Sequence, residues 1–373
     1  MIRFCSIVAA VLTIMLASVA LAQSSNRGPG PDRLALGTVR VGATVEASFG
    51  LSDVAKDPKK VVFTVEAPDF VKVLDKSVFP GDVDLVDDEL IKGVHAVVVI
   101  AIDTNKPGTF EGEIKVTLGG HAAKVPVSVV VKSADAAAIR ILVAESPFHA
   151  YSTSDGGTFK AWTDLVTDAK WNVDYLSVTR GKPVLRDLDL TRYGTVLLPG
   201  DALVSATEQD INGLRAFVEK GGRLVIAANH FFGRSVEKAN TILDGYGLKM
   251  VDAEAPLSAN AVTVDDASFG PELVKAGIKS ARFFRASPAV IADAKRAKVL
   301  VKAAWVGGTD DGFVAIARAG KGEVVALGQS LWWHWISTDG AKGTDNAKLL
   351  RFLPTSLPKF SRNRVCRREC SIW

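Results

Sequence analysis

Apolar side chains recur at every second position between residues 34 and 132. This period is typical of strands that bury one face. The clearest runs begin at Val45, Val61, Val94, Ile114 and Val125. No stretch shows a helical period. Turn signals separate the runs, at Asp57-Pro58, Pro80-Gly81, Lys106-Pro107-Gly108 and Gly119-Gly120. The pattern predicts an antiparallel β-sandwich.

Beyond Ile139 the apolar pattern alternates between strand and helix. Phe159, Trp162 and Val166 stand at helical spacing, and Ser205 with Glu208 predicts a capping box for a second helix. Further helices are predicted around Val236 and after Asp345. Strands are predicted at Ile139–Val143, Trp171–Val178, Thr195–Leu198, Arg223–Ala228, Phe313–Ala317 and Glu323–Leu327. This alternation predicts a parallel sheet with helices on both faces.

The first 22 residues have the pattern of a secretory signal peptide. Arg3 precedes an uncharged apolar run from Ile7 to Ala17, and Ala20-Leu21-Ala22 fits the cleavage rule. Cleavage predicts an exported protein, periplasmic or extracellular. The alternative is that this segment stays uncleaved and contacts a membrane. Residues 23–32 are polar and rich in Gly and Pro, which predicts a linker.

The net charge of +4 resides in the C-terminal tail. Five bases and one acid lie between Thr355 and Trp373, so the rest of the chain is neutral. We expect residues 356–373 to be a disordered, solvated basic tail. No folded face interleaves bases with aromatic residues, which argues against nucleic acid as a partner.

Cysteines are scarce. Cys5 belongs to the signal segment, and Cys366 and Cys370 stand in the tail, where they could pair with each other or with another chain. No histidine lies near them to complete a zinc site. Both expected domains are therefore cysteine-free, and we expect neither a metal nor a cofactor.

The sandwich region resembles the bacterial Ig-like domains. The resemblance lies in an opening motif, "LGTVRVGATVEASFGLSD", that starts at Leu36, and in a closing hairpin, "PGTFEGEIKVTLGGHAAKVPVSVVV", that starts at Pro107. It implies an Ig-like domain over residues 33–132 that acts as a spacer or interaction module.

The second region resembles class I glutamine-amidotransferase-like proteins, in particular their trehalose-utilisation-like branch. Two motifs carry the resemblance: "EQDINGLRAFVEKGGRLVIAANHFF" from Glu208, and "AGKGEVVALGQSLWWHW" from Ala319 followed by "TDNAKLLRFL". The resemblance implies a three-layer, flavodoxin-like α/β domain over residues 137–355.

The catalytic residues of a true amidotransferase are missing. Such enzymes carry a cysteine nucleophile in the turn after the Gly-Gly strand, where this chain has Ala228-Asn229-His230. His334 falls near the place of the family's histidine, but the acidic partner is absent, because Ile336 and Ser337 follow. A nucleophile needs a base and an orienting group, so the amidotransferase reaction is not expected.

Five residues are expected at the carboxyl ends of the strands, where open α/β sheets bind ligands. They are Asn229, His230, Asp201, Gln329 and Glu145. The alternative for His230 is a loop histidine that packs on Phe231. A metal site among these acids and histidines lacks any supporting spacing, and Gly328-Gln329-Ser330 is only half of a serine-hydrolase elbow.

His334 stands among Trp332, Trp333 and Trp335. This arrangement suits an aromatic sugar pocket, but a closing segment packed on the last helix is the favoured interpretation.

The leading hypothesis is a non-catalytic, exported binding or scaffold protein of the cell envelope. Its partner would be a small molecule, a glycan or an envelope protein, bound at the strand ends. The alternative is a hydrolase of envelope or sugar substrates that uses His230 and His334 as acid and base. A purely structural adaptor would lack a concave site.

Overall fold

The computed structural model describes residues 33–53, 60–86, 89–133, 139–145, 158–178, 185, 188–228, 234–253, 261–303, 311–329, 335–336 and 342–355. The predicted signal peptide, the linker and the basic tail lie outside these residues. Among the residues described, no helix is both long and apolar enough to cross a membrane.

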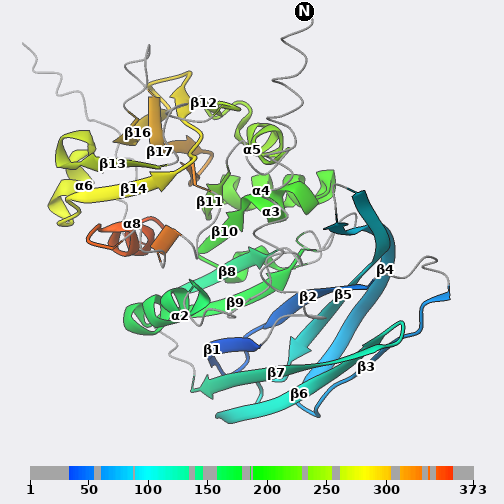
Figure 1. The fold of residues 1–373 in the computed structure, drawn as a ribbon. Helices are drawn as coiled ribbons and strands as arrows, with labels where there is room; N and C mark the ends of the chain where they lie inside the picture. Colours follow the sequence, from blue (N-terminus) through cyan, green and yellow to red (C-terminus); the bar gives the residue numbers. More distant parts are fainter. Residues whose placement is uncertain are drawn as a thin grey trace, which may run out of the picture.

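The N-terminal part consists of strands arranged in two sheets (Figure 1). One sheet has the order β1-β7-β6-β3 and the other β2-β5-β4. The strands are β1 (Leu34–Arg40), β2 (Glu46–Asp53), β3 (Phe63–Glu66), β4 (Val71–Val86), β5 (Glu89–Ile102), β6 (Gly108–Leu118) and β7 (His121–Lys132).

The inward face of these strands is made by the period-two apolar positions. Val94, Ala96, Val98 and Ile100 of β5 are all fully buried, and so is Ile114 of β6. They belong to one hydrophobic cluster with the inward residues of β2 and β7. The predicted alternation of burial is clear in β7 and the second half of β6, whereas Val97 and Val99 of β5 are buried as well.

Two expectations for this region are wrong. The strands are not all antiparallel, because β1 pairs with β7 in parallel. Pro80-Gly81 is not a turn but lies inside β4, which pairs with β5 along its whole length. β4 is the outer strand of its sheet, so a proline that lacks an N–H costs no bond to a second neighbour.

The C-terminal part contains a nine-stranded sheet of order β12-β15-β17-β18-β11-β10-β8-β9, with β16 beside β17. Its strands are β8 (Arg140–Glu145), β9 (Asn172–Ser177), β10 (Thr195–Pro199), β11 (Arg223–Ala227), β12 (Leu248–Met250), β15 (Ala289–Ile291), β16 (Ala297–Lys302), β17 (Asp311–Ala319) and β18 (Gly322–Leu327). The five strands from β18 to β9 are mutually parallel. The predicted mixed α/β architecture is thus confirmed.

Helices cover both faces of this sheet, as the alternation predicted. One face packs against α2 and α8 and the other against α3, α4 and α5, in separate apolar clusters. A small sheet, β13 (Ala261–Asp265) with β14 (Ser280–Phe284), adjoins α8. The helices are α2 (Thr158–Ala169), α3 (Gly200–Ser205), α4 (Glu208–Glu219), α5 (Ser235–Leu243), α6 (Pro271–Lys275) and α8 (Asn346–Phe352), with short 3-10 turns η3 (Leu190–Arg192) and η4 (Asp266–Ser268).

The capping box of α4 is two residues later than predicted. Thr207 is the N-cap: its hydroxyl accepts from the backbone N–H of Asp210, and the Asp210 carboxylate accepts from the backbone N–H of Thr207. Ser205 does not cap the helix, because it ends the preceding helix α3.

The two parts of the chain join at the outer edge of β9. Tyr175 donates its backbone N–H to the carbonyl of Thr44 at 2.8 Å, and Ser177 donates its own to the Glu46 carboxylate at 3.1 Å. The hydroxyls of Ser48 and Ser177 lie 3.0 Å apart. Burial raises the pKa of Glu46, against a lowering effect of the Ser177 N–H. The start of β2 therefore occupies an edge that would otherwise be open.

Candidate functional site

The carboxyl ends of four parallel strands define one edge of the sheet. These strands end at Glu145, Pro199, Ala227 and Leu327. Because they are parallel neighbours, the residues that follow them lie along the same edge. In open α/β sheets this edge is where ligands bind.

The structure brings three of the predicted site residues to this edge by their position in the chain. Glu145 is the last residue of β8, Asp201 lies in the first turn of α3, and Gln329 follows β18 by two residues. Asn229, His230 and His334 lie outside the described residues. The five-residue ligand site and the acid–base roles of His230 and His334 in the hydrolase alternative therefore both stay predictions.

Gln329 has a structural role. Its side chain is buried, with 2% exposed, and its Oε1 accepts the backbone N–H of Phe284 at 2.8 Å. The preceding Gly328 lies so close to the segment after β14 that a Cβ would stand 2.0 Å from the carbonyl oxygen of Ser287. This close approach explains the glycine without a nucleophile elbow.

Side chains close the free edge of β14, a device that the sequence analysis missed. Asn346 accepts the backbone N–H of Arg282 at 2.8 Å and donates to its carbonyl at 3.0 Å. The indole of Trp335 donates to the same carbonyl at 2.6 Å. Asn346 also donates to the carbonyl of Trp335 at 2.8 Å, so the three residues form one closed network.

Asp345 extends this closure by one more residue pair. Its carboxylate accepts the backbone N–H groups of Lys279 and Ser280 at 2.8 and 3.3 Å, and its own N–H bonds the Ser280 carbonyl. Burial works to raise the pKa of Asp345, but the bonds from Lys348 and from the Lys279 N–H outweigh it and lower the pKa. Side chains thus replace a missing neighbour strand along β14.

The segment after β14 links this edge to a cleft. The backbone N–H of Ser287 bonds the carbonyl of Gly328 at 3.0 Å, just beyond the carboxyl end of β18. The next carbonyl, that of Pro288, accepts the N–H of Val251 at 2.8 Å. Val251 is one of the residues that line the cleft.

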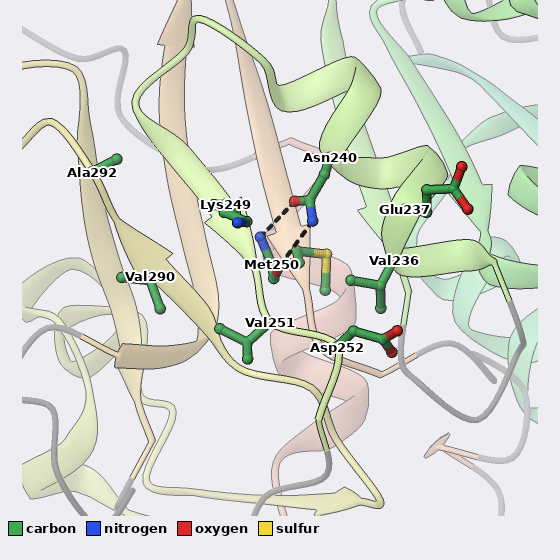
Figure 2. A pocket seen from close by; sticks show the side chains of 9 residues that line it. All are labelled: Val236, Glu237, Asn240, Lys249, Met250, Val251, Asp252, Val290 and Ala292. Atoms are coloured by element: carbon green, nitrogen blue, oxygen red, sulfur yellow. Dashed lines mark hydrogen bonds between the residues drawn. The ribbon is translucent and has the colours of Figure 1, made fainter.

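The cleft lies between α5, β12 and β15 and has a volume of about 520 Å³ (Figure 2). Val236, Met250, Val251 and Val290 supply its apolar surface. Asn240 lies in the middle of the view, where its amide bonds both the N–H and the carbonyl of Met250, at 2.8 and 2.9 Å. β12 therefore also has its free edge closed by a side chain.

The rim of the cleft is charged but nearly balanced. Glu237 is bound by both nitrogens of the Arg234 fork at 2.8 Å, and this hydrogen bond lowers the pKa of the Glu237 carboxyl. Lys249 and Asp252 are exposed at the rim. The cleft has no strong preference for one sign of charge.

Within the described part of the chain, no group of three or more His, Cys, Asp or Glu side chains is placed to hold a metal ion. The Asp53 carboxylate lies 3.5 Å from the ring of His121, and Ser52 lies 2.8 Å from the ring of His95. Both pairs are on the N-terminal strands, away from the carboxyl edge.

The fold and this edge define the class: a mixed α/β protein with a mostly parallel sheet and strand-rich additions. No protein with a curated description matches the chain. Residues 150–351, more than half of the chain, match the model of the family described as "Domain of unknown function (DUF4350)". The chain therefore belongs to this family.

Several solved structures are similar to the chain at 13% identity. A cytoplasmic protein of Salmonella typhimurium LT2 has a TM-score of 0.40, with 59% of this chain and 100% of that chain covered. A ThuA-like protein of Parabacteroides merdae has a TM-score of 0.36, with 61% and 94% covered. A β-galactosidase from Rahnella sp. R3 has a TM-score of 0.35, with 53% and 29% covered. Likeness at this level carries no argument about activity.

Proposed function

We propose that this protein is an exported, non-catalytic binding protein of the cell envelope. In this proposal residues 33–132 form an Ig-like spacer or docking module. Residues 137–355 form a flavodoxin-like, amidotransferase-like domain that binds a small molecule or glycan beside the carboxyl edge of its sheet.

The observation that carries the proposal is the cleft beside that edge. Its volume of about 520 Å³ lies within the range of small-molecule sites, which measure roughly 300–1,000 Å³. Its floor is apolar, and a few polar groups stand at the rim, which is the usual composition of such sites. A short path of backbone hydrogen bonds joins it to the end of β18.

Two features favour binding over catalysis. The three cysteines of the chain are Cys5, Cys366 and Cys370, so the turn after β11 carries no thiol. Gln329 is the predicted site residue whose side chain the structure describes. Its amide oxygen accepts the backbone N–H of Phe284. A group that already holds the backbone is poorly placed to bind or activate a substrate.

The experiment is a thermal-shift screen of the mature protein against sugars, sugar derivatives and other small metabolites. Val290→Trp would fill the cleft from its partly exposed wall, and Val274→Trp, on the exposed face of α6, is the matched control. We expect the first variant to abolish the shift caused by a hit and the second to preserve it. A shift that persists in Val290→Trp would remove the cleft from the proposal.

A second pair of variants addresses the strand-end residues and catalysis. We expect the Asn229→Ala/His230→Ala double variant to weaken the binding of the same hit. Turnover of a hit that disappears in His230→Ala and in His334→Ala would replace the binding proposal with the hydrolase alternative. N-terminal sequencing of the exported protein tests export, with Gln23 as the expected first residue.

A further inference from the structure

Arg282 of β14 carries a cationic group for which the described part of the chain supplies no counter-ion. Its side chain is partly buried, its Nε is fully buried, and among the described residues the guanidinium has no hydrogen-bond or ion-pair partner. Its guanidinium carbon lies 5.3 Å from the centre of the Phe284 ring. A partly desolvated cation without a partner is unfavourable.

Two other partly buried arginines, both on the main sheet, are paired with acidic side chains. Arg140 donates to Asp174 at 2.7 Å with 29% of its side chain exposed, and Arg223 donates to Glu323 at 2.7 Å with 13% exposed. Both pairs span neighbouring strands of the main sheet. Arg282 stands opposite Thr263 of β13, which supplies no charge.

The backbone of Arg282 is held more firmly than its side chain. Asn346 bonds both its N–H and its carbonyl, and the indole of Trp335 donates to the same carbonyl. These two side chains are buried, with 1% and 0% exposed. The fold therefore fixes the position from which the guanidinium projects and leaves its donors unused.

A second cation follows at Arg285, in an uncommon backbone conformation. Its φ is +46°, in the left-handed region that non-glycine residues rarely adopt. The bond from Phe284 to Gln329 precedes it, and the bond from Ser287 to Gly328 follows it. The segment is thus fixed on both sides at the carboxyl end of β18, and strained residues of this kind cluster at functional sites.

We propose that Arg282, beside Phe284, binds an oxyanion: the carboxylate or phosphate group of a soluble ligand. The planar guanidinium of Arg282 presents a fork of donors that matches such groups. The bound anion supplies the missing counter-charge, and the clamp on β14 holds the fork in place. This site is separate from the cleft and does not depend on the proposed function.

The test measures thermal stability of the full mature protein against inorganic phosphate and against malonate, with ionic strength kept constant by sodium chloride. Phosphate and malonate separate a preference for phosphate from a preference for carboxylate. We expect at least one of the two anions to raise the melting temperature of the unmodified protein in a saturable manner. No saturable shift with either anion would overturn the proposal.

One arginine variant and a control identify the site. We expect Arg282→Gln to weaken the apparent affinity at least tenfold. Arg192→Gln, on an exposed turn, should leave it unchanged. Without the anion, Arg282→Gln should melt at the same temperature as the unmodified protein or higher, because an uncompensated charge has been removed. An equal anion shift in Arg282→Gln, or its marked destabilisation without anion, would instead show a structural arginine.

Discussion

β12 and β14 each lack a neighbouring strand on one edge, and side chains cover these two edges to different degrees. Each short strand has a neighbour on one edge, β15 for β12 and β13 for β14, and each has its other edge closed by a helical asparagine. Asn240 alone closes β12 by bonding Met250. Asn346 closes β14 together with Trp335, Asp345 and Gln329.

The difference lies in how much of the edge remains open to water. Asn346 is buried, with 1% exposed, whereas Asn240 is partly exposed and borders the cleft. Exposed backbone edges invite pairing with other chains, and short strands and covering side chains limit this risk. The closure of β14 therefore holds the backbone of Arg282 in place, whereas the closure of β12 leaves space beside that strand.

The largest effect is expected from Asn346→Leu. The change keeps the size of the side chain but leaves the N–H of Arg282 and the carbonyl of Trp335 without partners in a buried place. Each such group costs about 1–3 kcal/mol, so we expect a loss of about 3 kcal/mol in the free energy of unfolding, measured by urea denaturation. Asn346→Asp, which keeps the acceptor, should lose less. A loss below that of the β12 variant would reverse the comparison.

Asn240→Leu should cost less, about 1.5 kcal/mol, because water in the cleft can replace part of the lost bonding to Met250. The same urea titration measures it. The two substitutions are chemically identical, so the ratio of their effects compares the three bonds of the buried Asn346 with the two bonds of the partly exposed Asn240. Equal losses would mean that the cleft is closed to water in solution.

Compared with alanine, glycine should have opposite effects on stability at the residues that follow β14 and β12. Arg285 follows β14 with a positive φ, so Arg285→Gly should be more stable than Arg285→Ala by about 1 kcal/mol. Val251 follows β12 and is not among the residues with positive φ. There, Val251→Gly should be less stable than Val251→Ala. Melting temperatures of the four variants are sufficient, and the same sign at both positions would contradict the backbone assignment.

The smallest expected effect is a pH dependence of stability that arises from Asp345, which closes one edge of β14. The pKa of Asp345 is lowered in the folded state, so its contribution is present above the unfolded pKa of about 4 and is lost as the pH falls through the folded pKa. Because the group is near solvent, we expect only about 0.5 kcal/mol. The difference in urea midpoint between the unmodified protein and Asp345→Asn should shrink between pH 6 and pH 3, whereas the effect of Asn240→Leu should stay constant. A difference that does not change with pH would contradict this role for Asp345.

The alternating patterns predicted most of the elements. Period two along β7 and helical spacing in α2 and α4 reflect burial of one face, which is a local property of the sequence. The departures have local causes. Pro80 sits in an outer strand, where a proline is tolerated, and Thr207 rather than Ser205 caps α4 because α3 ends at Ser205.

The closures of β12 and β14 could not be predicted in this way. Asn346 and Arg282 are 64 residues apart, and Gln329 and Phe284 are 45 apart. The partners of an amide side chain depend on which backbone groups the tertiary fold leaves unpaired, and no period in the sequence records that. The ligand role predicted for Gln329 stays a prediction, and the bond from its amide oxygen to the N–H of Phe284 has no signal in the sequence pattern.

The junction at β9 has a practical consequence for shortened versions of the protein. A chain beginning at Ile139 would keep the parallel sheet but lose Thr44 and Glu46, which bond the N–H groups of Tyr175 and Ser177. β9 would then become an open edge able to pair with a second molecule. Self-association of such a fragment would reflect the missing N-terminal strands rather than the native assembly of the protein.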